Sequence, residues 1–424
     1  MIDKLIKQVQ ENLSKIPDTR KGNKTYEQID SLMAAFAMFS LKDSSLLTFR
    51  KELPARADNL KRIYGLAKIP ADTAMRQTID KIPPKEFSEQ FCQLQPILRE
   101  NKVFASRKVL GGYLTASLDA TGTFCSCKTA CENCLVKNFK NGTKQYYHQM
   151  LAVVQVHHNQ KTVFPLYAEA IIQQDGYKKN DCEINASKRL IPSLRESMPE
   201  DKLLIVADAL YANAPFVRLV QSEEMKFITV VKQGYALLQA KRLDEKGALK
   251  YKQWRKKGRI CHVGYTTGLI FSGQNQDLLV NYVQYTETDT ETGKVYYNGK
   301  WLTDLPIDQL SLEEFVAVAR SRWKVENETF NTLKNQGYHL EHNFGHGEKY
   351  LATNFAFLTI LAFLVDQITQ HLDNSFNKVW ETWGSKKLTW QKIREVFNQF
   401  PCASMNAIYR YLVKELTINL PLLE

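Results

Sequence analysis

The chain has 424 residues, of which 44% are hydrophobic, so it can bury a sizeable core and is long enough for two or three domains. This composition excludes a disordered protein. The 57 Lys and Arg residues outnumber the 45 Asp and Glu residues and give a net charge of +12, which favours a polyanionic partner but also occurs in proteins that bind no nucleic acid.

The N-terminal sequence MIDKLIKQVQENLSKI alternates charged and apolar residues at helical spacing and lacks the apolar stretch of a secretory signal. The longest apolar stretch, near residues 355–365, is too short to span a bilayer and predicts a buried helix. Eight cysteines in a long chain without a signal favour a reducing compartment over a disulfide framework. We therefore expect a cytoplasmic protein that does not contact a membrane.

Residues 1 to about 105 are predicted to be helical, because apolar residues recur every three or four positions in IDSLMAAFAMFSL and KEFSEQFCQLQPIL. Between these segments, Asp72 or Thr73 could cap a short helix that carries Arg76. A basic helical domain over residues 1–108 is consistent with DNA binding, in which Arg76 would take part, although helical bundles of other purpose share the pattern.

The apolar period changes to two at Tyr113, where YLTASLD predicts a strand that ends on Asp119, before the turn signal Ala-Thr-Gly. Apolar runs at residues 149–158 and 162–172 predict two further strands joined by a short turn. These three strands would form a meander.

A helical stretch at residues 180–195 is followed by KLLIVAD, which predicts a buried strand ending on Asp208, and a further helix and strand reach residue 232. A right-handed crossover can place this strand beside the first one. Asp119 and Asp208 would then lie close together at the carboxyl ends of adjacent strands.

After about residue 235 the alternation of helix and strand stops. Residues 240–305 contain short strand-like runs with Gly and Asp turns, which predicts a β-rich insertion. The helical pattern returns from Leu312 through FVAVARSRWKVENETFNTLK, which places Arg322 and Glu326 four residues apart on one helix face.

Asp119, Asp208 and Glu326 could form a cradle for divalent cations. Each alone has a common structural explanation as a turn former, a helix cap or a solvated helix residue. Together they suit the hydrolysis of a phosphodiester, because two Mg²⁺ or Mn²⁺ ions neutralise charge and activate an oxygen nucleophile, and such ions prefer carboxylate ligands. Arg322 could hold a phosphate or pair with the carboxylate.

Three stretches, SLDATG, IVADALYANAPFV and RSRWKVENETFNTLKNQGYHLEHNFGHG, resemble the catalytic stretches of DDE transposases of bacterial insertion sequences. GNKTYEQIDSLMAAFAMFSLKDSSLLTF and KKNDCEINASKRLIPSLRE resemble the same group. The resemblance implies an α/β fold in which an RNase H-like mixed sheet is flanked by helices. This catalytic core would comprise residues 109–235 and 308–347, with a β-rich insertion at 236–307 and a helical C-terminal region at 348–424.

The resemblance also implies a function. Asp119, Asp208 and Glu326 would bind two Mg²⁺ or Mn²⁺ ions and catalyse strand cleavage and strand transfer. The partners would be double-stranded DNA, as terminal inverted repeats and target DNA, and a second copy of the chain in a synaptic homodimer associated with the bacterial nucleoid. A nuclease of the same fold without strand transfer and a catalytically silent DNA-binding regulator are the alternatives.

Arg322 matches the arginine that precedes the glutamate in the hairpin-forming members of this group. Two positions depart from the pattern of those members, since Ala319 stands where they have Tyr and Leu333 where they have Lys. Lys334 is one residue further along and is turned about a quarter of the way round an α-helix. Its role and a hairpin intermediate are therefore open.

Further candidates for DNA contact are basic or aromatic. Trp301 in the insertion could stack on a flipped base, as could Trp254 or Tyr265, although aromatic residues are also common in the core of β structure. The basic candidates are Lys178, Lys179, Lys188, Arg189 and Lys334, whose charges could equally belong to a solvated face.

The segment CSCKTACENC places Cys125, Cys127, Cys131 and Cys134 within ten residues. Four thiolates at CxC and CxxC spacing suit a closed, structural Zn²⁺ site that would order this loop. Redox-active thiols and unrelated cysteines are the alternatives. His148, His157 and His158 follow the loop and could be ligands or phosphate contacts, but such residues more often have a structural role.

Overall fold

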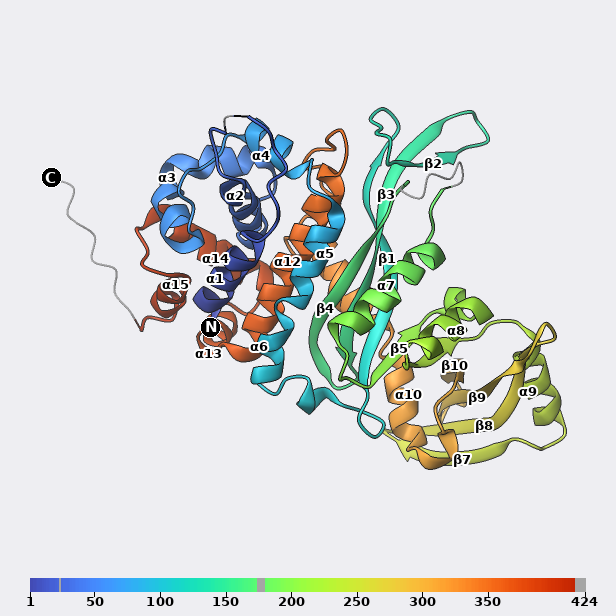
Figure 1. Cartoon of the computed structure of the whole chain (residues 1–424). Coiled ribbons are helices and arrows are strands. Elements are labelled where there is room, and N and C mark those ends of the chain that lie inside the picture. Colours follow the sequence, from blue (N-terminus) through green and yellow to red (C-terminus); the bar gives the residue numbers. More distant parts are fainter. Residues whose placement is uncertain (23, 174–179, 416–424) are drawn as a thin grey trace.

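The computed structural model describes residues 1–22, 24–173 and 180–415. The N-terminal part is helical, as predicted, and Figure 1 shows these helices on one side of the molecule. Its helices are α1 (Ile2–Leu13), α2 (Gln28–Ser40), α3 (Leu46–Tyr64), α4 (Asp72–Ile79), α5 (Pro84–Cys92) and α6 (Gln95–Glu100). The side chain of Ser45 caps α3 by accepting a hydrogen bond from the backbone N–H of Thr48.

The C-terminal helices pack against the N-terminal ones, so the two ends of the sequence form one helical body (Figure 1). They are α12 (Leu351–Leu372), α13 (Asn374–Trp383), α14 (Lys386–Gln399) and α15 (Met405–Leu412). Among the described helices, only α12 is long and apolar enough to cross a membrane, and its apolar window is entirely buried within the protein. The buried helix predicted around residues 355–365 is therefore confirmed.

The central sheet is mixed (Figure 1). Its core strands are β1 (Leu114–Ser126), β2 (Leu135–Asn138), β3 (Lys144–His157), β4 (Gln160–Ile171), β5 (Leu203–Ala207) and β6 (Lys226–Val230). β3 is antiparallel to both β1 and β4, whereas β1, β5 and β6 are parallel and lie in that order. Two crossover helices, α7 (Glu183–Ser197) and α8 (Ala214–Ser222), connect these strands. This arrangement confirms the mixed, RNase H-like sheet and the adjacency of the first and fourth predicted strands.

The first strand is longer than predicted. Asp119 does not end β1 but pairs with Ala152 of β3, and the strand continues to Ser126. The sequence Ala-Thr-Gly does not form a turn. The pairing of β1 with β3 continues through it and past an irregularity between Gly122 and Phe124. The parallel pairing with β5 stops earlier, at Ser117. Asp119 therefore lies where β1 has lost its parallel neighbour but is still held by β3.

The insertion is rich in strands, as predicted, and its sheet is continuous with the core sheet because β10 pairs with β6. It consists of α9 (Tyr235–Glu245), β7 (Lys250–Lys256), β8 (Arg259–Ser272), β9 (Asn275–Asp289) and β10 (Val295–Thr303).

The helix predicted after the insertion is not continuous. Helix α10 (Leu312–Arg320) is followed by a turn at residues 321–322 and then, after one more short helical step, by a π-helix (Val325–Phe330) that runs into α11 (Asn331–Asn335). Short π-helical segments are frequent at functional sites. This one contains Glu326.

Candidate active site

Asp119, Asp208 and Glu326 come from three elements and converge. Asp208 follows β5, where its Oδ1 accepts a hydrogen bond from the backbone N–H of Leu210 at 2.8 Å. Burial raises the pKa of Asp119, and the negative charges of Asp208 and Glu326 raise it further, against the lowering effects of the Ala120 N–H and Arg322. The three carboxylates are thus close enough to act on one another.

Arg322 belongs to the same group of residues. Its Nη1 lies 4.0 Å from Oδ2 of Asp119, and about a quarter of each side chain is exposed, 24% and 28%. The hydroxyl of Ser117 donates to the backbone carbonyl of Arg322 at 3.2 Å, which ties this turn to β1. The arginine therefore faces Asp119, and the predicted four-residue relation to Glu326 is altered by the turn and the π-helix between α10 and α11.

A second glutamate, Glu328, lies two residues after Glu326 on the same π-helix, and the two act on different neighbours. The charge of Glu328 acts on Lys324 and Lys386. Burial lowers the pKa of both lysines, and the negative charge of Glu328 partly opposes this effect. The charge of Glu326 acts on Asp119. These electrostatic effects favour Glu326 over Glu328 as the third acid.

A fourth carboxylate, which no sequence pattern predicted, lies near Asp119 and Asp208. Glu183 is the first residue of α7, and its pKa is raised by burial and then by the charges of Asp119 and Asp208. The buried hydroxyl of Tyr211 lies next to Glu183, and burial together with these acids raises its pKa. The segment KKNDCEINASKRLIPSLRE was expected to resemble transposases and to supply basic residues for DNA contact, but its acid Glu183 was not among the predicted site residues.

The donor set fits hard divalent cations, which bind carboxylate oxygens. The raised pKa of Asp119 shows that its ionised form is not fully compensated by Arg322 or by the backbone, and a bound cation would provide that compensation. The ligand atoms of these acids are less close together than those of a second group of potential metal ligands, which contains cysteines and histidines. In the described part of the chain, the ligand atoms of Cys131, Cys134, His148 and His346 all lie within 4.8 Å of one another.

The predicted four-cysteine site is not what the structure brings together. Cys125 pairs with Tyr147 within the sheet, and its Sγ accepts a hydrogen bond from Gln145 at 2.8 Å. Cys125 and Cys127 are both exposed. Strand β1 thus carries Cys125 away from the loop that contains Cys131 and Cys134, and two histidines take the places of the exposed cysteines. The cysteine spacing could not predict His346, which lies 212 residues after Cys134.

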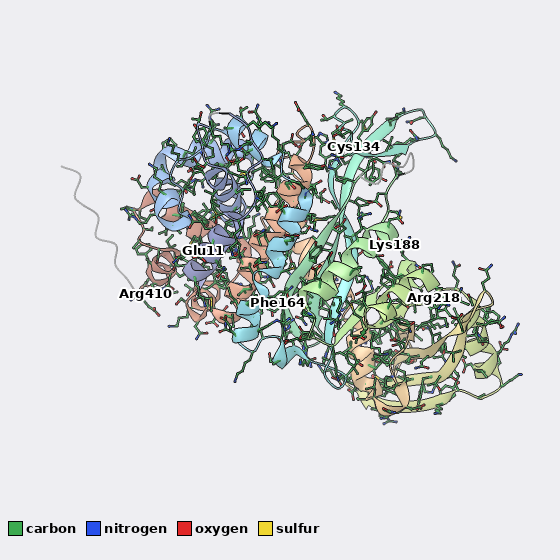
Figure 2. All side chains as sticks on the ribbon, viewed as in Figure 1. Glu11, Cys134, Phe164, Lys188, Arg218 and Arg410 are labelled. Carbon is green, nitrogen blue, oxygen red and sulfur yellow. The ribbon has the colours of Figure 1, made fainter. Side chains whose placement is uncertain are left out.

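The predicted DNA contacts have different surroundings. Lys188 is exposed on α7 and is labelled in Figure 2. Arg189 instead forms ion pairs with Glu169 at 2.6 Å and with Asp181 at 2.7 Å, so it joins α7 to β4. Arg76 pairs with Asp72 at 3.2 Å and is partly exposed.

Trp301 cannot stack on a base in this structure, because it is only 1% exposed and packs against Phe315 and Tyr297 in the core between the insertion and α10. The prediction of a DNA contact there is wrong, since this aromatic side chain serves the core. Lys178 and Lys179 lie outside the described residues.

Lys334 is partly buried, and its Nζ lies 2.9 Å from Oε1 of Glu341. A π-helical turn takes in about one residue more than an α-helical turn. Eight residues that include this turn therefore rotate about as far as seven residues of an α-helix. This rotation places Lys334 on the same face of the helix as Glu326. Leu333, by contrast, is fully buried.

Strand order and convergent acids define an enzyme of the RNase H-like class. The family model described as the transposase DDE domain matches residues 129–364, more than half of the chain, and the chain belongs to this family. The protein is therefore a transposase, an enzyme of DNA cleavage and transfer. Asp208 and Glu326 lie within the matched residues, whereas Asp119 precedes them.

Among solved structures, a piggyBac transposase synaptic complex with hairpin DNA is similar to this chain, with 13% sequence identity and a TM-score of 0.45. The similarity covers 97% of this chain and 77% of that chain. No curated protein sequence matches this chain significantly.

Proposed function

We propose that this transposase cleaves DNA at the ends of its own element and joins the freed 3′ ends to target DNA. Asp119, Asp208 and Glu326 would hold two Mg²⁺ or Mn²⁺ ions. The observation that carries this proposal is the placement of the acids: Asp119 lies on β1 and Asp208 follows the paired strand β5, while Arg322, on the segment that leads to Glu326, lies 4.0 Å from Asp119.

When bound, such ions neutralise phosphate charge and activate an oxygen nucleophile. The protein supplies the positions of the ligands. β1 and β5 hold Asp119 and Asp208, and the Ser117 hydroxyl holds the turn of Arg322 against β1. The guanidinium of Arg322 lies 4.0 Å from Asp119, so it can bind a phosphate oxygen beside the acids.

We further propose that the partners are the terminal inverted repeats and target DNA, bound by a homodimer in a synaptic complex associated with the bacterial nucleoid. The net charge of +12 supports a polyanionic partner. Arg76, Lys188 and Lys334 are the described basic residues proposed to contact DNA, and each has some exposed surface. The division of the chain at residues 108, 235, 307 and 347 is part of the same proposal.

Strand cleavage of end-sequence DNA by the purified full chain with Mg²⁺ tests the site. We expect Asp119→Asn, Asp208→Asn and Glu326→Gln each to lower the cleavage rate at least about 100-fold, the scale on which single groups that stabilise a transition state act. Glu328→Gln is the matched control and should cleave normally. Normal cleavage by Asp119→Asn would refute the assignment.

The same assay separates the alternatives. Labelled ends that are cut but never joined to a target plasmid would indicate a nuclease without strand transfer. Binding without metal-dependent nicking would indicate a catalytically silent regulator.

A further inference from the structure

Four potential metal ligands meet at one end of the central sheet. Cys131 and Cys134 lie in the connection between β1 and β2, His148 lies on β3, and His346 precedes α12. Figure 2 labels Cys134 near the end of the sheet that is remote from the insertion. Cys134, His148 and His346 are buried, with exposed fractions of 6%, 0% and 7%.

We propose that Cys131, Cys134, His148 and His346 bind a structural Zn²⁺ ion. In a tetrahedral site with Zn–S distances of about 2.3 Å and Zn–N distances of about 2.0–2.1 Å, the two sulfurs lie about 3.8 Å apart and each sulfur lies about 3.6 Å from a nitrogen. Here the two Sγ atoms are 3.6 Å apart. Nε2 of His148 lies 3.4 Å from Cys131 Sγ and 3.3 Å from Cys134 Sγ, and Nε2 of His346 lies 3.4 Å from Cys134 Sγ.

The two imidazoles are oriented for coordination. The Nδ1 of His346 lies 3.0 Å from the carbonyl of Gly347, which can only accept, so Nδ1 carries the proton and Nε2 presents a lone pair to the sulfurs. The Nδ1 of His148 lies 3.3 Å from the buried hydroxyl of Thr353. Partners of this kind on the outer ring nitrogen are typical of histidines that bind zinc through the other nitrogen.

Hydrogen bonds alone do not account for the group. With both imidazoles neutral, the two thiols and Nε2 of His148 supply at most three protons, whereas the sulfurs and the Nε2 atoms make four contacts of 3.3–3.6 Å. A cation between two thiolates and two neutral imidazoles satisfies all four at once. The backbone N–H of Cys131 also donates to Cys134 Sγ at 3.4 Å, which suits a thiolate acceptor. The S–S separation of 3.6 Å is far from the roughly 2.05 Å of a disulfide.

The ligand chemistry selects the metal and its role. Thiolate and imidazole ligands in a tetrahedral set favour zinc over the hard cations that carboxylates bind. Four protein ligands leave no open position for water or substrate, which is the pattern of a structural site. The site is therefore distinct from the acids in both composition and function.

The ion would join segments that are far apart in sequence. His346 lies between α11, which follows the π-helix of Glu326, and α12. Its ring packs at 4.2 Å from the ring of Phe124 on β1. The residues just after His346 are also held by the N-terminal helices. Asp80, at the end of α4, accepts hydrogen bonds of 2.9–3.3 Å from the backbone N–H groups of residues 348–351. Zinc would thus fix the start of α12 to the β1–β3 pair, where the helical body meets the sheet.

Metal analysis of the full chain, purified without chelators, tests the proposal. We expect one zinc ion per chain, and a decrease of at least about tenfold in zinc content for Cys134→Ser and His346→Ala. Cys127→Ser, in the same loop, and His157→Ala, on the same strand as His148, are the matched controls and should retain zinc. Retention of zinc by His346→Ala would overturn the proposal.

Two measurements on the unsubstituted protein keep the test decisive if a variant fails to fold. X-ray absorption at the zinc edge should show two sulfur and two nitrogen ligands, whereas four sulfurs would restore the four-cysteine arrangement and overturn this one. Mass spectrometry under non-reducing conditions should show free Cys131 and Cys134. A disulfide between them, or a chain without zinc, would also overturn it.

Discussion

At the scale of single residues, the position of Asp119 is more informative than its type. Aspartate is depleted in strands, and its common explanation as a turn former does not apply to a residue that is paired within β1. Its pKa is raised by burial and by two neighbouring acids. Both features support the proposal that Asp119 binds a cation.

We expect Asp119→Asn to have a small positive effect on thermal stability in the absence of divalent ions. The folded-state pKa of Asp119 is raised, so its ionised form lowers stability at neutral pH, and the amide removes that charge. Mg²⁺ should raise the Tm of the unsubstituted protein and of Glu328→Gln, but not that of Asp119→Asn. Thermal unfolding with and without Mg²⁺ measures this, and an equal Mg²⁺ shift in Asp119→Asn would contradict it.

At the scale of elements, the π-helix shows where sequence patterns stop being sufficient. The apolar spacing from Leu312 correctly predicted a helical segment and placed Glu326 on it. It could not predict the extra residue in one turn, because buried positions such as Val325 and Phe330 fit either helix type. The one-residue displacement of Lys334 was the only visible sign.

If the π-helix accommodates one additional residue, deletion of the exposed Asn327 should be tolerated. The shortened segment can form a continuous α-helix in which Lys334 keeps its rotation relative to Glu326. We expect cleavage within about tenfold of the unsubstituted rate and an equal or higher Tm, since regular α-helical hydrogen bonds replace the π-helical ones.

The matched control is insertion of one Ala after Asn331, which rotates Lys334 by about 100° relative to Glu326. This variant should fold but lose most of its cleavage activity. Loss of cleavage in a folded Asn327 deletion, with normal cleavage in the insertion variant, would contradict the assignment of Lys334 to that face.

One carboxylate of the insertion, Glu287, links two of its elements to α10. Glu287 of β9 accepts hydrogen bonds from Arg259 of β8 at 2.6 Å and from Arg320 of α10 at 2.8 Å. Burial acts to raise the pKa of Glu287, but the two arginines outweigh it, and the pKa lies below its usual 4.5. Its ionised form therefore stabilises the fold above pH 4.5, and this contribution is lost as the pH falls.

We expect Glu287→Gln to lower the free energy of unfolding at pH 7 by about 1–3 kcal/mol, the range for hydrogen bonds to charged groups. The difference from the unsubstituted protein should shrink as the pH falls below about 4.5. Urea unfolding across this pH range measures it. Glu313→Gln, whose exposed carboxylate lies 3.5 Å from Lys256, is the control and should change little. A difference independent of pH would contradict the ionic explanation.

At the scale of the whole molecule, rules about chain connection predicted more than local motifs did. The right-handed crossover correctly placed β1 beside β5. Nothing local predicted that helices at the two ends would form one body, because contacts such as Asn59 with the carbonyl of Phe397 join residues that are distant in sequence. His346 was missed as a partner of Cys131 and Cys134 for the same reason.

A buried ion pair joins the N-terminal helices to α12. Lys42, after α2, lies 2.6 Å from Asp366 of α12, and their side chains are 0% and 5% exposed. The ammonium group also lies over the ring of Trp390, and the hydroxyl of Tyr338 donates to Asp366. Each charge depends on the other, because neither has access to bulk water.

We expect Lys42→Met to lower the free energy of unfolding by about 3–5 kcal/mol, since it leaves Asp366 buried without its cation. The double variant Lys42→Met/Asp366→Leu should recover most of that loss, because no charge is then stranded. Lys7→Met, which removes an exposed partner of Glu11, is the control and should cost less than about 1 kcal/mol. Urea unfolding of the unsubstituted protein and of these three variants measures the losses. A double variant less stable than Lys42→Met would show that the pair itself stabilises the joined ends, beyond the cost of an unpaired charge.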